Sequence, residues 1–235
     1  MFAKAISQNR EAIYAILGSS PLQSNAITPS LGSAFMVAPG LLITAAHCIL
    51  DVSKPAKAPR ENLRVIRALD IGKKAEPAVV VASDGGKDLA LLRIDAPQSK
   101  ACLKLLDAPV PIGTHCGTSG FPCITVDFAP RSGISHIELF QGADISSFLS
   151  ETGPNGDAVS RYETDSPLFG DSSGCPGFVE SGEVFGMCRR SVVDPPGNDG
   201  RPGGSAGPTG SGVTLWVPSM DIIAFAKANG IALRS

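Results

Sequence analysis

Three short stretches of the chain carry side chains that are used together in acyl transfer. His47 follows an apolar run and can serve as a base, because imidazole titrates near neutral pH. Asp88 opens an apolar run, where a carboxylate is costly to bury unless strong donors meet it. Ser172 and Ser173 lie in a turn, residues 170–178, whose small residues let backbone N–H groups point toward one oxyanion. These residue types suit nucleophilic attack on a carbonyl carbon.

Taken singly, each stretch has a structural interpretation that needs no chemistry. A lone histidine after a strand is commonly a buried, hydrogen-bonded residue. An aspartate before a strand commonly caps a turn, and a segment rich in glycine and serine is commonly only a turn. The occurrence of all three in one β-rich chain favours a joint, catalytic interpretation.

Together the three stretches resemble the trypsin/chymotrypsin family of serine proteases. Residues 44–48 read T-A-A-H-C, the histidine motif of that family, and residues 88–92 read D-L-A-L-L, close to its aspartate motif. Weaker similarities lie at residues 113–122, 164–165, 182–186 and 215–226. Within the family the chain is most similar to bacterial peptidases of the HtrA type and the glutamyl-endopeptidase type. The resemblance covers about residues 30–228 and implies an all-β fold of two six-stranded antiparallel β-barrels, without cofactor or metal.

The resemblance leaves two registers for the nucleophile. Alignment on G-D-S selects Ser172 and puts Gly170 at the oxyanion glycine, whereas alignment on S-G-x-P selects Ser173. We favour Ser173, because this register also fits the upstream T-D and the downstream glycines. Asp171 then occupies a position where the family prefers glycine.

The mechanism implied by the resemblance gives each residue a role. His47 is the general base, Asp88 orients its ring, and Ser173 is the nucleophile. The backbone N–H groups of Ser173 and Asp171 are expected to hold the oxyanion.

The segment after Gly186 is expected to border the substrate. Pro167, near the expected base of the specificity pocket, offers no charge for a basic side chain. The candidate substrate-binding residues are Arg189, Arg190 and Ser191, and the two arginines favour an acidic side chain through charge-assisted hydrogen bonds. The alternative is that one or both arginines face solvent.

The elements that must position these residues are short strands separated by turns. The expected strands are residues 33–37, 41–44, 63–68, 78–82 and 89–94 in the first half, and residues 113–121, 134–139, 162–164, 177–179, 184–188 and 213–217 in the second. Such spacing is typical of small antiparallel barrels.

The sequence predicts that the chain is organised as an N-terminal helix followed by two barrels. Residues 1–18 are expected to form an amphipathic helix, because their apolar residues recur at helical spacing. Residues 19–108 are expected to form the first barrel, which holds His47 and Asp88, and residues 109–235 the second barrel, which holds Ser173.

The second barrel is expected to contain a long loop and to end in a helix. Residues 194–212 are rich in glycine and proline, which predicts a flexible loop that gates the substrate pocket. Residues 218–229 carry an apolar stripe and are followed by Gly230, which predicts a terminal helix.

Composition excludes several classes of protein. The chain has 235 residues, of which 43% are hydrophobic and 18% charged, so it is too apolar to be disordered. Its formal charge of −2 argues against nucleic acid or an acidic membrane as a partner. Its longest apolar runs are too short to span a membrane. With only three histidines and no Cys-x-x-Cys pair, a zinc cluster is poorly supported.

The first residues lack the uninterrupted apolar core of a secretory signal. We therefore expect a cytoplasmic protein, or a secreted one whose leader has been removed. The six cysteines are accordingly expected to be reduced thiols.

The sequence thus predicts a serine endopeptidase that acts on polypeptides, with a regulatory or activating protein as a further expected partner. The first alternative is a catalytically impaired chymotrypsin-fold protein used for binding or regulation, suggested by Asp171 and Cys175 in a glycine-rich turn. An esterase with a Gly-Asp-Ser motif is disfavoured, because the motif comes late in a β-rich chain.

Overall fold

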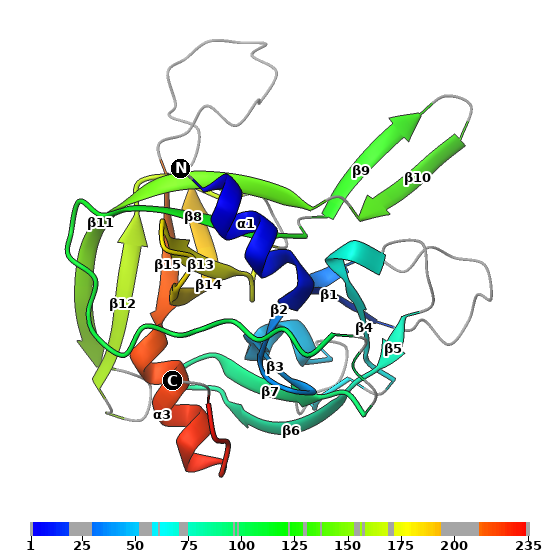
Figure 1. The fold of residues 1–235 in the computed structure, drawn as a ribbon, viewed down its shortest axis with the longest axis horizontal. Coiled ribbons are helices and arrows are strands. Elements are labelled where there is room, and N and C mark those ends of the chain that lie inside the picture. Colours follow the sequence, from blue (N-terminus) through cyan, green and yellow to red (C-terminus); the bar gives the residue numbers. More distant parts are fainter. Residues whose placement is uncertain are drawn as a thin grey trace.

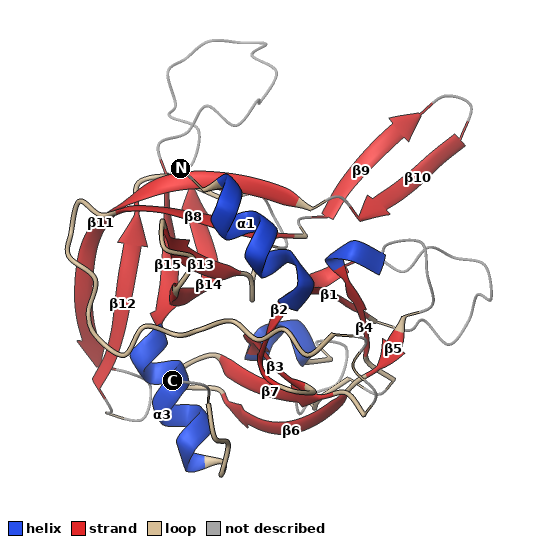
Figure 2. Ribbon diagram, viewed as in Figure 1, coloured by secondary structure: helices blue, strands red, loops and turns tan. Residues whose placement is uncertain are grey.

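The fold is almost entirely β, and apart from one hairpin the described strands form two curved sheets that lie side by side (Figures 1 and 2). The computed structural model describes residues 2–18, 30–51, 58–60, 62–70, 75–95, 97, 99–121, 123–128, 131–136, 138–152, 156, 158–168, 172–193 and 212–233. The predicted all-β class is confirmed.

The first sheet has the strand order β5-β4-β1-β2-β3-β7-β6. Its strands are β1 (Ile13–Leu17), β2 (Ser30–Ala38), β3 (Leu41–Ala45), β4 (Arg64–Arg67), β5 (Glu76–Pro77), β6 (Val79–Asp84) and β7 (Leu89–Arg93). Only Ala78 separates β5 from β6, and its N–H still donates to the carbonyl of Leu63, 2.9 Å away. The two edges of the sheet are therefore consecutive pieces of one bent strand, so the sheet curls back on itself as a six-stranded barrel does.

The second sheet is a closed barrel with the order β11-β12-β15-β14-β13-β8. Its strands are β8 (His115–Gly120), β11 (Leu139–Thr152), β12 (Ala158–Thr164), β13 (Pro176–Val179), β14 (Val184–Val193) and β15 (Gly212–Pro218). A separate hairpin of β9 (Cys123–Phe128) and β10 (Arg131–His136) projects from it (Figure 1). Closure of the barrel leaves no edge strand to be covered.

The N-terminal helix is shorter than the sequence predicts. Helix α1 covers Ala3–Asn9, a 3-10 turn follows at Arg10–Ala12, and the remainder of the predicted helix is strand β1. The prediction of a helix through residue 18 is therefore wrong beyond Asn9. Strand β1 pairs with β2 on one side and β4 on the other, and this central place in the sheet overrides its helical spacing.

Helix α1 packs on the second barrel, although the strand that follows it belongs to the first sheet (Figure 1). The ring of Phe2 lies 5.8 Å from the ring of Phe178 in β13, measured between centroids. The buried side chain of Asn9 donates from Nδ2 to the carbonyl of Gly182, 2.9 Å away. The beginning of the chain thus joins the two halves.

The terminal helix is confirmed as α3, Ser219–Ala228. No helix in the described ranges is long and apolar enough to cross a membrane. Of the predicted loop 194–212, only Gly212 lies within the described residues, where it begins β15.

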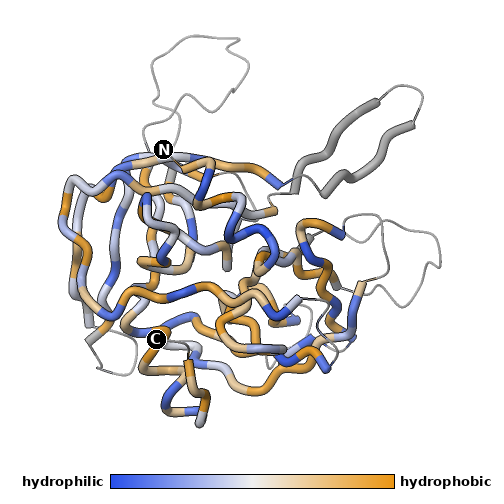
Figure 3. The backbone as a smooth tube through the Cα atoms, viewed as in Figure 1, coloured by the Kyte–Doolittle hydropathy of each residue, from blue (hydrophilic) through white to orange (hydrophobic). Residues whose placement is uncertain are grey.

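The main apolar core is shared between the two halves. It contains Met36 and Leu42 from the first sheet together with Met187, Val217 and Ile222 from β14, β15 and α3. The hydrophobic stretches along β7 and α3, in the lower part of the view, contribute to this core (Figure 3). A smaller core fills the second barrel and includes Tyr162, Cys188 and Trp216. Because one core crosses the boundary, residues from both halves are held at fixed positions along it.

Candidate active site

His47 stands at the boundary between the halves, in the four-residue helix α2 (Ala46–Ile49) directly after β3. Its side chain is 47% exposed, so the ring is accessible from solvent. Nδ1 lies 2.8 Å from Oδ2 of Asp88, and the backbone N–H of His47 donates to Oδ1 of Asp88 at 3.0 Å. The carboxylate therefore binds both the ring and the main chain of His47, which fixes the orientation of the ring and leaves Nε2 as the outward nitrogen.

Asp88 is held in an uncommon backbone conformation at the start of β7. Its φ is +59°, in the left-handed region that aspartate tolerates better than most residues. Its carbonyl accepts from the N–H of Ala46 at 3.0 Å. Its side chain is only 12% exposed. The predicted partner for this buried carboxylate is thus present, and it is His47.

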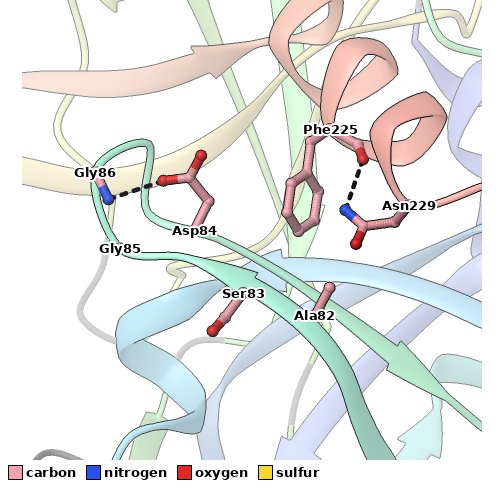
Figure 4. Close-up of a pocket in the computed structure, with 7 residues that line it drawn as sticks. All are labelled: Ala82, Ser83, Asp84, Gly85, Gly86, Phe225 and Asn229. Atoms are coloured by element: carbon pink, nitrogen blue, oxygen red, sulfur yellow. Dashed lines mark hydrogen bonds between the residues drawn. The ribbon is translucent and has the colours of Figure 1, made fainter. Parts of the chain in front are cut away.

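The turn before Asp88 is tied to the terminal helix. Oδ1 of Asp84 accepts from the N–H groups of Gly86 and Lys87, and Nζ of Lys87 lies 2.6 Å from Oδ1 of Asp221 in α3. An open hollow of about 580 Å³ lies between this turn and α3, bordered by Asp84, Gly86 and Phe225 (Figure 4). None of the three proposed catalytic residues lines this hollow.

The Asp88 carboxylate raises the pKa of His47 well above its ordinary value of 6.5. The main cause is the hydrogen bond between the two side chains; the neighbouring Cys48 adds to it, and burial opposes it. A base with a raised pKa accepts a proton more strongly. Its neutral form, which is the form that accepts the proton, predominates only at correspondingly higher pH.

Ser173 lies across the boundary, in the turn that leads into β13. Its hydroxyl donates to the carbonyl of Arg189 at 3.0 Å, and within the described part of the chain no hydrogen bond joins it to His47. Ser172 is buried, with 6% of its surface exposed, whereas Ser173 is half-buried. The predicted oxyanion residue Asp171 lies outside the described residues.

The turn at Ser173 is pinned to the first sheet through its backbone. The carbonyl of Ser173 accepts from the N–H of Ser33 at 2.8 Å, and the carbonyl of Ser33 accepts from Oγ1 of Thr44 at 2.7 Å. Oγ of Ser33 in turn accepts from the N–H of Phe121, 2.9 Å away. Thr44 precedes His47 by three residues in the chain. One buried network of hydrogen bonds therefore positions the serine turn relative to the histidine.

Gly174 makes this approach sterically feasible. Its φ is +84°, and a Cβ there would lie directly against the carbonyl oxygen of Ser33 and 2.5 Å from Oγ1 of Thr44. Its N–H donates to the carbonyl of Cys188 at 2.8 Å, which ties the turn to β14. Both the conformation and the contact require glycine.

The three predicted substrate-binding residues have different surroundings. Nε of Arg189 lies 3.5 Å from Oδ2 of Asp88, so this side chain points to the proposed triad. Arg190 is exposed. Oγ of Ser191 accepts from the N–H of Leu168 and lies 3.1 Å from Oγ1 of Thr214, an internal network next to Pro167. Arg190 is therefore the member of the set whose side chain is most open to a substrate.

Sequence reasoning missed Ser33 and the contact between Arg189 and Asp88. Thr44 belongs to the histidine motif, but its spacing gives no hint that it holds the carbonyl of Ser33. The position of Arg189 depends on a bulge in β14, where the register with β15 shifts between Cys188 and Arg190. No local sequence signal marks such a bulge here.

The cysteines whose side chains are described are in the thiol form. They are Cys48, Cys102, Cys116, Cys175 and Cys188. Burial raises the pKa of the Cys116 thiol to about 12. Within the described ranges, no group of three or more histidine, cysteine or acidic side chains is arranged to hold a metal ion.

Comparison with known proteins identifies the family and the fold. A family model described as the trypsin-like peptidase domain matches residues 32–187. The solved structure of the Rv3671c protease from M. tuberculosis, active form, is similar, with a TM-score of 0.67 and 17% identity over 98% of this chain and 86% of that chain. A search of curated proteins found no significant match.

Two further solved structures show the same likeness. The HtrA-type protease AlgW with decapeptide has a TM-score of 0.67 and 19% identity, covering 97% of this chain and 67% of that chain. The serine endoprotease from Yersinia pestis has a TM-score of 0.67 and 18% identity, covering 97% of this chain and 66% of that chain. At these identities the structures establish the fold, and the family match extends over well over half of the sequence. The chain therefore belongs to the family of trypsin-like peptidase domains.

Proposed function

We propose that this protein is a serine endopeptidase in which His47, Asp88 and Ser173 form the catalytic triad. The observation that carries the proposal is the 2.8 Å contact between His47 Nδ1 and Asp88 Oδ2, which leaves Nε2 facing outward. Ser173 is anchored opposite by the hydrogen bond between its carbonyl and the N–H of Ser33. Membership of the trypsin-like peptidase family supports a protease function for this arrangement.

The mechanism follows from the roles of these groups. His47 Nε2 takes the Ser173 hydroxyl proton while Oγ attacks the peptide carbonyl carbon. The protonated ring then gives that proton to the leaving amine, and the C–N bond breaks to leave an acyl group on Ser173. Water, deprotonated by His47, releases the acyl group. Asp88 stabilises the imidazolium in both steps, while the backbone N–H group of Ser173 donates to the oxyanion.

An active-site probe tests the proposal. We expect a fluorophosphonate to modify the wild-type protein once, and peptide mapping to place the phosphonyl group on Ser173. His47→Ala should remove the labelling, because the hydroxyl then has no base. An adduct on Ser172, or labelling that persists in His47→Ala, would contradict the proposed triad.

The alternative is a catalytically impaired member of the family that binds polypeptides without cleaving them. The direction of the Ser173 hydroxyl, toward the Arg189 carbonyl, favours this alternative. Rotation about χ1 of serine is rapid, so this orientation does not by itself prevent attack. The same probe separates the two functions, because an impaired protein stays unlabelled under all conditions.

We further propose that substrates carry an acidic side chain near the scissile bond, bound by Arg190. The exposed guanidinium of Arg190 supports this assignment, and Arg161 and Arg190 both lie within electrostatic reach of Arg189. Pro167, close to the serine turn, contributes no charge that would attract a basic side chain. Charge-assisted hydrogen bonds from arginine to a carboxylate are among the stronger polar contacts.

Arg190→Gln should therefore weaken the preference for acidic peptides. We expect the ratio of kcat/KM for a Glu-containing peptide to that for its Gln-containing twin to fall about fivefold to tenfold. Turnover of the Gln peptide should change little. The matched control is Arg93→Gln, which removes an exposed arginine whose partner is Asp95. An unchanged Glu/Gln ratio in Arg190→Gln would show that this arginine does not read the substrate.

A further inference from the structure

Strand β14 contains a bulge beside the serine turn, and Arg189 is its extra residue. Cys188 pairs with Trp216 and Arg190 pairs with Leu215, so the register leaves no residue of β15 opposite Arg189. A bulge bends the strand locally and redirects a side chain. Cys188 faces the inside of the second barrel, whereas the side chain of Arg189 reaches Asp88 on the first sheet.

Arg189 touches two of the three proposed catalytic residues. Its carbonyl accepts from the Ser173 hydroxyl at 3.0 Å, and its Nε lies 3.5 Å from Oδ2 of Asp88. That oxygen is the one that His47 Nδ1 meets at 2.8 Å. A single carboxylate oxygen thus lies between the imidazole and a guanidinium.

Burial keeps these interactions strong. The side chains of Arg189 and Asp88 are 23% and 12% exposed, so solvent screens their contact less than it screens a surface pair. Burial lowers the pKa of Arg189, as do the positive charges of Arg161 and Arg190, whereas Asp88 opposes the decrease. Arginine nevertheless keeps its charge in proteins, so this cation is permanent.

The groups that act on the His47 ring come from three elements. Asp88 at the start of β7 favours the protonated ring, as does Cys48 in α2, and burial disfavours it. Arg189 in β14 places a positive charge on the carboxylate that His47 uses. A positive charge so close to Asp88 offsets part of its negative charge, so it opposes protonation of His47.

We propose that Arg189 is a positioning residue of the catalytic triad, whose guanidinium fixes the Asp88 carboxylate and extends the neutral, proton-accepting form of His47 to lower pH. This inference rests on the proposed function and deepens it, because it concerns the same site. It also gives Arg189 a role other than the substrate contact that the sequence suggests.

The Arg189 charge should lower the pH at which hydrolysis becomes active. Hydrolysis requires neutral His47, so kcat/KM rises with pH through the pKa of this ring. Because Asp88 raises that pKa, the acid limb of the wild-type profile should lie above 6.5. Removal of the Arg189 charge makes protonation easier and should move the limb further upward. For a charge several ångströms away in a partly solvated site, the expected shift is about one pH unit.

The experiment compares pH profiles of kcat/KM for the full chain. Arg189→Met and Arg189→Gln both remove the charge, so either one suffices if the other folds poorly. Each should shift the acid limb upward by about one unit. Arg189→Lys keeps the charge and should hold the limb within a few tenths of a unit of wild type. Arg93→Met, which removes a charge from an exposed ion pair, should leave the limb in place.

A second measurement does not depend on hydrolysis. NMR titration of the His47 ring in Ser173→Ala, with and without Arg189→Met, reports the pKa directly, and His115 and His136 serve as internal references. We expect the His47 pKa to be higher in the double variant. An unchanged or lower pKa, or a uniform loss of rate with no shift of the limb, would overturn the inference. If no variant hydrolyses peptides, the proposed function fails while the titration still decides the role of Arg189.

Discussion

Ser173→Ala should lower kcat/KM for peptide hydrolysis on the order of 10⁴- to 10⁶-fold, as removal of a nucleophile does in serine proteases generally. The loss should fall on kcat rather than on substrate binding, because the proposed role of Ser173 is to form the acyl intermediate. The measurement is the rate of cleavage of a peptide that wild type hydrolyses, with products identified by mass spectrometry.

Ser172→Ala is the matched variant for this experiment. Ser172 is buried and its hydroxyl is not the one that contacts Arg189, so we expect a far smaller loss of rate. The double variant Ser173→Ala/His47→Ala should be no slower than Ser173→Ala alone, because residues that act as one unit are not additive. A collapse of activity in Ser172→Ala, with activity retained in Ser173→Ala, would reverse the assignment of the nucleophile.

Gly174→Ala should be the most destabilising single methyl addition in the described part of the site. Its Cβ would press on the Ser33 carbonyl and on Oγ1 of Thr44, and φ is +84°. Left-handed backbone costs about 1–2 kcal/mol for alanine, and overpacking adds about 1–3 kcal/mol or more, so we expect a loss of about 4 kcal/mol in the free energy of unfolding. That is a large fraction of the stability of a typical domain.

Gly113→Ala separates the two contributions. Gly113 has the same φ of +84°, but a Cβ there has no neighbour within 4 Å. This control should therefore lose only the backbone cost of about 1–2 kcal/mol. Denaturant unfolding of both variants measures the difference, which is the steric part at Gly174. Equal losses in the two variants would show that the serine turn is not pressed against Ser33.

Gly174→Ala should also affect catalysis. If Gly174→Ala folds, the turn must move away from Ser33 and carry Ser173 with it. A displacement of about 1 Å at a reacting group costs on the order of 100-fold in rate. Gly113→Ala, which lies outside the site, should retain its turnover.

Much of the fold could be predicted from the sequence, because apolar runs and turn residues mark most of the strands. The helix at the N-terminus shows the limit of that reasoning. Ile13 and Leu17 have the four-residue spacing of a helical face, yet both belong to β1. Pairing with β2 and β4 decides the conformation of this segment, and those partners are distant in the chain.

In the proposed site, some residues could likewise be predicted from local motifs, whereas the roles of others depend on pairing between distant strands. His47 and Asp88 stand on local motifs, and the structure brings them together. The target of Arg189 could not be predicted, because it depends on a bulge whose position is set by the pairing of β14 with β15. The role of Ser33 likewise appears only when the second barrel is placed against the first sheet.

The packing of helix α1 on the second barrel has a consequence for the order of events during synthesis. Asn9 is translated 173 residues before its acceptor, the carbonyl of Gly182. Ser33 must likewise wait for Ser173. Contacts of such long sequence separation form late and slow folding. A nascent chain therefore cannot assemble the proposed hydrolytic centre before Ser173 has been translated, and a chain interrupted earlier would carry the proposed base His47 without its nucleophile.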